Sequence, residues 1–200
     1  MQINNKKLLQ IVIPLVIMIS IGLSFITPEV LISLNGSSSG GVLAYSSASF
    51  FGINTGIYGN NFWSWSEFSS TSANYLRPSV AAAVSTGVDV IYASLACAIL
   101  AFLVSLVYLI FAFINPPRRL KGKELLFPEI GLILLVMTLG LYYAGLSYAY
   151  NVFISSSSPP SNRYTSSFYP LYGTDFLILA LALNIVYVLL SLTSWKKTAI

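Results

Sequence analysis

The chain has 200 residues and a formal net charge of +4; only 8% of its residues are charged, whereas 56% are hydrophobic. A soluble domain carries about 25% charged residues and could not bury so much apolar surface, so we expect a single membrane domain over residues 1–200. The chain has no histidine, which excludes haem and copper sites built on imidazole. Its single cysteine excludes an internal disulfide and a metal site made of several thiolates.

Four segments are long and apolar enough to cross a bilayer as helices, which takes about 20 residues each. The first follows Lys6 and Lys7 as a signal peptide would, but its long apolar stretch favours a retained helix with a kink at Pro14. Pro78 suits a first helical turn, so the second helix is expected to begin there, to be about 55 Å long and to exceed the bilayer. The four apolar segments cover approximately residues 8–27, 91–114, 130–150 and 176–194.

The basic residues predict the orientation of these helices. Eight of the ten fall on one side of a four-span arrangement, and only Arg77 and Arg163 fall on the other. Because basic residues are retained on the cytoplasmic side, we expect a multi-pass plasma-membrane protein with both termini in the cytoplasm. Topology explains these charges, so no nucleic-acid partner is expected. The eight residues are Lys6, Lys7, Arg118, Arg119, Lys121, Lys123, Lys196 and Lys197.

The first outer segment, about residues 28–79, contains runs with strand character at 42–45, 49–53 and 62–68. The expected fold class is therefore an all-α membrane protein, a four-transmembrane-helix bundle with a small extracytoplasmic β-rich cap. In a strand over 62–68, two tryptophans share one face and a phenylalanine lies on the other. These aromatic residues form either an outer contact surface for a partner or the core and interface anchor of the sheet. They are Trp63, Trp65 and Phe68.

The second outer segment, about residues 151–174, begins with serines and prolines at 155–161 that we expect to be extended. The aromatic residues that follow would pack on the first outer segment or lie at the lipid surface. Thr174 or Asp175 is expected to cap the fourth helix. In the first outer segment, Asn35-Gly36-Ser37 matches the N-glycosylation sequon, which makes Asn35 a candidate glycosylation site.

The predicted outer side has few charged residues. Carboxylates that are paired in a folded protein destabilise it as the pH falls, so a surface with few of them tolerates acid. The absence of outer disulfides argues against a typical animal secretory protein. The composition therefore favours an archaeal protein from an acidic habitat. The charged residues counted on this side are Glu29, Glu67, Arg77, Asp89 and Arg163.

Small residues recur every four positions along the second predicted helix. In membranes this spacing lets helix backbones approach closely. We expect this stripe, together with Gly140 and Ala144 of the third helix, to face neighbouring helices of this chain or of another. The stripe consists of Ser85, Asp89, Ala93, Cys97, Ala101 and Ser105.

Two polar residues in or near the spans have alternative interpretations. Asn184 lies near the centre of the fourth span, where its amide either hydrogen-bonds across helices or contacts a ligand or a pore. Asp89 lies near the outer boundary, where it has a structural role, such as pairing with Arg77, or binds a proton or cation.

No catalytic set is recognisable in the sequence. It contains no H-E-x-x-H, no G-x-S-x-G and no phosphate-binding glycine loop, and its six carboxylates are scattered. We therefore do not expect an enzyme, a cofactor or a bound metal.

The order of helices and loops resembles the claudin-like layout of claudins, peripheral myelin proteins and receptor-regulating relatives. The shared features are four helices with both ends inside, a first outer loop of about 50 residues and a second of about 24. Gly59, Trp63 and Arg77 lie near positions of that family's loop motif, whereas its two cysteines are missing. The resemblance implies a small sheet, supplied mostly by the first loop, over a left-handed four-helix bundle. As a structural analogy it does not imply a function.

These features predict a non-enzymatic integral membrane scaffold or accessory subunit that packs against partner helices and presents an extracytoplasmic contact surface. Its partners would be membrane lipids and either other membrane subunits or further copies of the chain. The sequence leaves three alternatives open. They are an oligomeric channel or transporter component lined by Asp89 and Asn184, an accessory subunit of a respiratory membrane complex, and a viral envelope protein.

Overall fold

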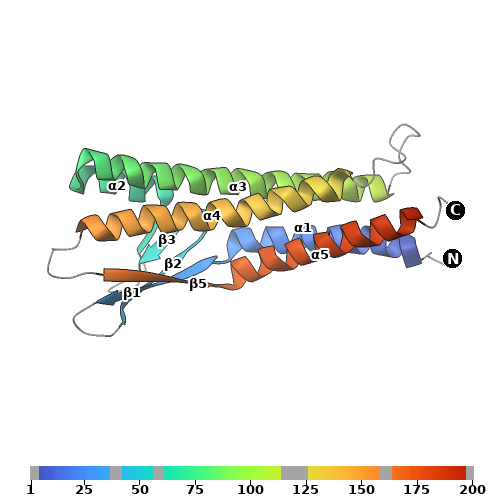
Figure 1. Cartoon of the computed structure of the whole chain (residues 1–200), viewed down its shortest axis with the longest axis horizontal. Coiled ribbons are helices and arrows are strands. Elements are labelled where there is room, and N and C mark those ends of the chain that lie inside the picture. Colours follow the sequence, from blue (N-terminus) through green and yellow to red (C-terminus); the bar gives the residue numbers. More distant parts are fainter. Residues whose placement is uncertain (1–4, 37–41, 56–60, 114–125, 158–163, 197–200) are drawn as a thin grey trace.

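A computed structural model describes residues 5–36, 42–55, 61–113, 126–157 and 164–196 of the chain. In these ranges four long helices run side by side, and an antiparallel sheet lies beside them toward one end (Figure 1). The fold is therefore mostly helical with a small sheet, as the composition and the strand-like runs predict. The long helices are α1 (Asn5–Ile26), α3 (Pro78–Phe113), α4 (Leu126–Ser157) and α5 (Tyr172–Lys196).

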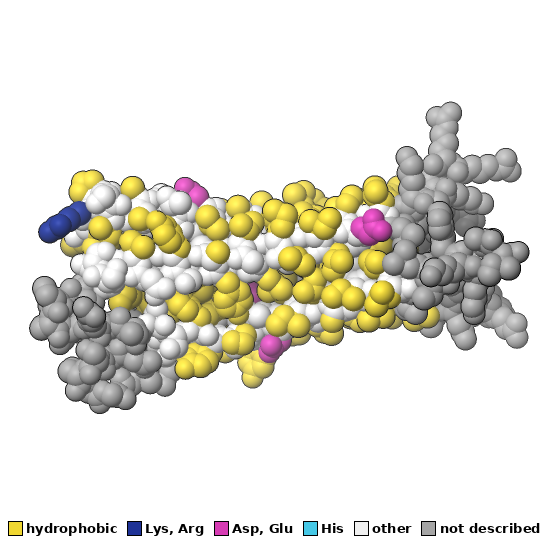
Figure 2. Space-filling view, viewed as in Figure 1, with side chains coloured by type: hydrophobic (Ala, Val, Ile, Leu, Met, Phe, Trp, Pro, Cys, Tyr) yellow, Lys and Arg dark blue, Asp and Glu magenta, His cyan; other side chains and the backbone are white. Residues whose placement is uncertain are grey.

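Three of the helices, α3, α4 and α5, are long and apolar enough to cross a membrane. The apolar part of α1 that the structure describes, Ile11–Ile26, is shorter. Figure 2 shows hydrophobic side chains spread along the length of the molecule, with few charged ones between them. All four long helices contribute exposed hydrophobic residues, and so apolar a surface suits contact with lipid better than contact with water.

The four long helices differ in length. At 1.5 Å per residue, the 36 residues of α3 and the 32 of α4 span about 54 Å and about 48 Å, against about 33 Å for α1 and about 37 Å for α5. As predicted, α3 begins at Pro78 and is longer than the roughly 30 Å hydrocarbon core of a bilayer. At the end of the molecule opposite the two termini, α3 and α4 extend past α1 and α5, and the sheet lies beside these extensions (Figure 1).

The sheet has five antiparallel strands in the order β4-β3-β2-β1-β5. Four strands come from the segment between α1 and α3, and the fifth comes from the segment between α4 and α5. β5 pairs with β1 along its whole length, so the second predicted outer segment lies against the first. Of its predicted aromatic contacts, Phe168 is half-buried against the core, whereas Tyr169 and Tyr172 are exposed. The strands are β1 (Val30–Gly36), β2 (Val42–Ala48), β3 (Gly52–Thr55), β4 (Asn61–Ser64) and β5 (Tyr164–Pro170).

The strand predicted over residues 62–68 is wrong beyond Ser64. There β4 ends and a helix that the alternating pattern did not predict begins, α2 (Trp65–Tyr75). Ser64 and Glu67 form a capping box: the Glu67 backbone N–H donates to the Ser64 hydroxyl (3.2 Å), and the Ser64 backbone N–H donates to the Glu67 carboxylate (2.8 Å). This pair satisfies two backbone donors at the helix start and so fixes the change from strand to helix.

Other boundaries also differ from the predictions. The strand expected over 42–45 continues to Ala48, and the strand expected over 49–53 begins only at Gly52. α4 continues to Ser157, so the extended structure expected from residue 155 is wrong for 155–157, and 158–161 lie outside the described residues. α5 begins at Tyr172, so neither Thr174 nor Asp175 is its N-cap. The Thr174 hydroxyl instead donates to the backbone carbonyl of Glu29 (2.7 Å).

One hydrophobic core joins the sheet to the helices. Ile32 and Ile53 of the sheet are fully buried in it. Phe50, in the turn between β2 and β3, packs edge-on against Phe25 of α1 and Tyr142 of α4, with ring centroids 5.9 Å and 5.1 Å apart. Aromatic pairs in this geometry add to the free energy gained by burial, so these contacts hold the sheet against α1 and α4.

Candidate functional site

α3 and α4 make a close contact in the halves that lie nearer the sheet. A Cβ atom added to Gly87 would lie 2.7 Å from the Cβ atom of Ala149, and one added to Gly145 would lie 2.7 Å from the backbone oxygen of Gly87. The two backbones therefore touch, and both glycines are required there. Farther along the same contact, the Ser94 hydroxyl donates to the Thr138 carbonyl oxygen (2.7 Å).

The predicted stripe of α3 follows this contact over only part of its length. Ala101 and Ser105 are buried, whereas Asp89 and Ala93 are exposed. The cause is geometric, because each step of four residues turns about 40° beyond a full helical turn and six such positions therefore sweep around the helix. The sequence signal that would have found the contact is a mixed spacing of three and four residues: Gly87, Ile91, Ser94 and Ala98. The remaining stripe residues, Ser85 and Cys97, are half-buried.

A second set of small residues on α4 faces away from the chain. Gly140 and Ala144 are exposed, and a Cβ atom at Gly140 would meet nothing within 4 Å among the described residues. We call this surface the Gly140 face of α4, and its packing against another chain stays a prediction. It also includes the exposed side chains of Ile133, Val136, Met137 and Tyr148.

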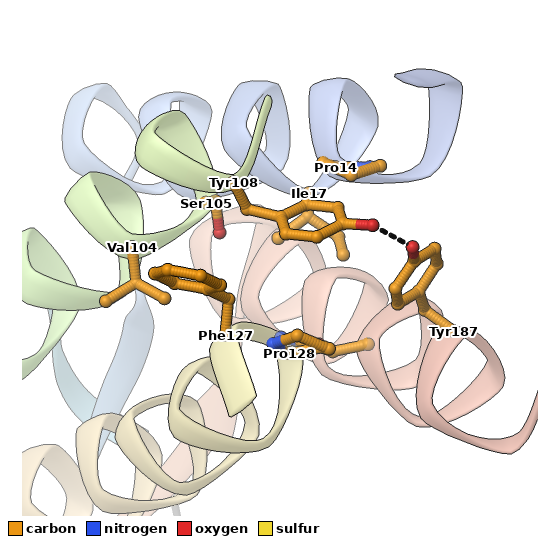
Figure 3. Close-up of a pocket in the computed structure, with 9 residues that line it drawn as sticks. Pro14, Ile17, Val104, Ser105, Tyr108, Phe127, Pro128 and Tyr187 are labelled. Carbon is orange, nitrogen blue, oxygen red and sulfur yellow. Dashed lines mark hydrogen bonds between the residues drawn. The ribbon is translucent and has the colours of Figure 1, made fainter. Parts of the chain in front are cut away.

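Asn184 lies in a polar cluster inside the helices. Its side chain is 3% exposed, and its amide nitrogen lies 2.9 Å from the position of a Cβ atom on Gly131 of α4. Close to it, the hydroxyl groups of Tyr108 and Tyr187 hydrogen-bond to each other between α3 and α5 (Figure 3). These residues border a cavity of about 20 Å³, which is room for about one water molecule.

Asp89 lies in a different part of the molecule from Asn184. It is exposed and borders an open groove of about 480 Å³ between α2 and α3, which serines of both helices also line. The small cavity beside Asn184 is lined by α1, α3, α4 and α5 and shares no described residue with this groove. The two polar residues therefore border separate spaces within one chain.

The outer contact surface predicted from the aromatic residues is wrong for Trp65 and Phe68. They are 1% and 5% exposed, so neither can offer a surface to a partner. The Trp65 ring nitrogen donates to the Ser49 carbonyl oxygen (3.0 Å), and Phe68 packs on Phe153 of α4 with ring centroids 5.0 Å apart. The alternative interpretation, a core, describes both residues, and Trp63 is half-buried at its edge.

A carboxyl group is buried where the sheet meets the helices, a feature that the sequence did not predict. Glu29 is 0% exposed, and neither of its carboxyl oxygens has a hydrogen-bond partner among the described residues. It packs on the first turn of α5, since a Cβ atom on Gly173 would lie 2.7 Å from its carboxyl carbon. The Tyr142 hydroxyl, equally buried and without a partner in the described part of the chain, interacts electrostatically with this carboxyl group.

Burial determines the protonation of this group. Loss of hydration raises the pKa of Glu29 from its ordinary value of 4.5 to about 8. The carboxyl group is therefore mostly uncharged at neutral pH. The sequence signal is a lone carboxylate, Glu29, directly before the apolar run Val30-Leu31-Ile32.

The candidate glycosylation site remains a prediction. Asn35 lies in β1, opposite Val42 and Thr165, but its side chain and the following Ser37 lie outside the described residues. Among the residues that the structure describes, no group of three Cys, Asp or Glu side chains could hold a metal ion.

Comparisons with known proteins assign no family to the chain. No protein-family model matches it, and no curated protein sequence is significantly similar to it. The geometry of the chain itself is therefore the basis for inferring its function.

Proposed function

We propose that the protein is a non-enzymatic membrane scaffold or accessory subunit, whose helix α4 packs against a helix of a partner subunit or of a second copy. Its outer sheet and α2 form a cap that is built on the extensions of α3 and α4. The observation that favours this proposal most is the contrast between the glycines of α4.

Glycine destabilises a helix by about 1 kcal/mol relative to alanine, so it needs a reason at each position. At Gly145 the reason is contact with the backbone of α3, whereas Gly140 meets nothing within the described chain. Gly140 and Ala144 form the small-x-x-x-small pattern that allows close helix approach in membranes. A helix of another chain would approach the backbone of α4 closely at these small residues.

The proposed topology has α1 as a fourth membrane span, with both termini in the cytoplasm. Support comes from the common end of the molecule at which α1 begins and α5 ends (Figure 1). Lys6 and Lys7 lie in the first turn of α1 and Lys196 is the last residue of α5, whereas Arg77 precedes α3 at the opposite end. This distribution agrees with retention of basic residues on the cytoplasmic side of a plasma membrane.

The sheet supports the proposed claudin-like layout. That layout implies a sheet supplied mostly by the first outer loop, and four of the five strands come from the segment between α1 and α3. The scarcity of outer carboxylates supports an archaeal protein adapted to acid.

Photo-crosslinking in native membranes tests the proposed interface. Met137, exposed on the Gly140 face, would be replaced by a photoreactive amino acid, and mass spectrometry would identify the products. We expect a covalent product with a second protein chain, which Gly140→Leu abolishes because the larger side chain keeps the helices apart. The same amino acid in place of the exposed Leu179 of α5 is the control and should label lipid. Lipid products alone at position 137 would contradict the proposal.

A further inference from the structure

The carboxyl group of Glu29 lies in surroundings that suit a neutral acid and not an anion. Both of its oxygens are buried without a partner among the described residues, and so is the nearby Tyr142 hydroxyl. Burying a charged group without a counterion or hydrogen bonds is strongly unfavourable, and such a group takes up a proton instead.

No cation among the described neighbours compensates a negative charge at this position. α4 contributes the phenols of Tyr142 and Tyr143, and the first turn of α5 contributes Asp175, which would repel an anion. β5 adds the exposed phenol of Tyr169, and the described side chains of β1 and β2 include no titratable group.

The N-terminus of α5 donates no hydrogen bond to the carboxyl oxygens of Glu29. Helix N-termini favour negative charge because their first N–H groups are free. Here the Gly173 N–H already donates to the Pro28 carbonyl oxygen (3.0 Å), and the Asp175 N–H donates to the Leu171 carbonyl oxygen (3.1 Å).

The backbone of Glu29, directly before β1, hydrogen-bonds to the end of β2 and to the start of α5. Its N–H donates to the Ala48 carbonyl oxygen at the end of β2 (2.8 Å). Its carbonyl oxygen accepts from the Leu171 N–H, which precedes α5 (2.8 Å), and from the Thr174 hydroxyl (2.7 Å). The backbone of Glu29 therefore links the carboxyl group directly to the contacts between the sheet and α5.

Pro28, Glu29 and the segment 171–174 form the junction between the sheet and α5. We propose that Glu29 is a proton-binding site that controls this junction: it is closed around the uncharged carboxyl group, and loss of the proton opens it. At low pH the junction is closed, and as the medium becomes alkaline the carboxylate draws in water and separates these segments.

The direction of the pH dependence follows from linkage. The pKa of Glu29 is about 8 in the folded protein and is ordinarily 4.5, so the folded state holds this proton over a range in which the opened state has released it. The stabilisation is complete below pH 4.5 and is lost as the pH rises to 8. Within that range the opening equilibrium constant rises by at most about tenfold for each pH unit.

Hydrogen exchange in the full chain tests the proposal at the amides of Leu171 and Gly173. Exchange would be measured between about pH 5 and about pH 9 in the wild-type protein and in Glu29→Gln, whose side chain has a similar shape and cannot ionise. The ratio of the two rates cancels the base catalysis common to both proteins. We expect this ratio to rise by up to about tenfold per pH unit and to level off above the pKa of Glu29. A ratio that does not change with pH would overturn the proposal.

A matched control and a second measurement accompany this experiment. Glu67→Gln removes an exposed carboxylate from the same outer cap, and its exchange should retain the alkaline increase of the wild type. If Glu29→Gln does not fold, infrared spectroscopy of the wild-type protein decides the question. A carboxylic-acid carbonyl band that persists at neutral pH and disappears in alkali supports the site, whereas its absence at neutral pH overturns it.

Discussion

Gly140 and Gly145 lie only five residues apart on α4, but their surroundings are opposite. Gly145 touches the backbone of α3 at Gly87, and Gly140 faces outward with nothing near it in the described chain. A methyl group at Gly145 must displace the backbone of α3, whereas a methyl group at Gly140 enters open space. The same substitution therefore separates packing inside the chain from packing against another chain.

We expect Gly145→Ala to destabilise the isolated chain by about 1–3 kcal/mol, as overpacking does in other cores. Gly140→Ala should be neutral or stabilising by up to about 1 kcal/mol, because alanine favours the helix. Denaturant unfolding of both variants in detergent, followed by circular dichroism, measures the difference. Equal stability of the two variants would show that the contact between α3 and α4 is looser than the structure indicates.

At the scale of secondary-structure elements, α2 forms because a helix N-cap outweighs the strand-like alternation of the sequence. Residues 62–68 alternate as a strand would, but Ser64 and Glu67 satisfy the first backbone donors of a helix. Hydrogen bonds from the backbone N–H and then the hydroxyl of Ser64 lower the pKa of Glu67. The cap is therefore intact above the ordinary pKa of Glu67 and weakens as the pH falls through the lowered value, the opposite direction to Glu29.

Replacing the capping hydroxyl tests this element. Ser64→Ala should destabilise the outer cap by about 0.5–2 kcal/mol, since the Glu67 N–H loses its acceptor. Ser70→Ala, an exposed position within α2, is the matched control and should have little effect. Thermal unfolding monitored by tryptophan fluorescence, to which the buried Trp65 contributes, reports the change. A loss of stability as large in the control would show that the cap itself contributes little.

The difference between local patterns and long-range pairing explains which elements of the fold could be predicted. Long apolar runs and Pro78 predict α3, α4 and α5 because membrane-length helices depend on local composition. β1 and β5 were missed because their pairing joins Val30 to Pro170, a contact that no local pattern contains. Glu29 was missed for the same reason, since its burial depends on α4 and α5 meeting around it.

At the scale of the whole molecule, α3 and α4 are a frame that extends beyond the two shorter helices. The sheet attaches to α4 of this frame through the core around Phe50 and Tyr142, and the junction at Glu29 attaches it to α5. The frame also presents the Gly140 face, on the part of its surface that no described element covers. In the proposed scaffold, a partner helix and the outer cap would therefore be held by the same helix, α4.

The size of the native assembly tests this account most directly. The wild-type protein, Gly140→Leu and the control Ala182→Leu, an exposed small residue of α5, would be extracted gently and sized on native gels with mass spectrometry. We expect the wild type and Ala182→Leu to migrate as assemblies larger than one chain, and Gly140→Leu to migrate as a folded single chain. A single-chain wild type, or an assembly that Gly140→Leu leaves intact, would contradict the proposed interface.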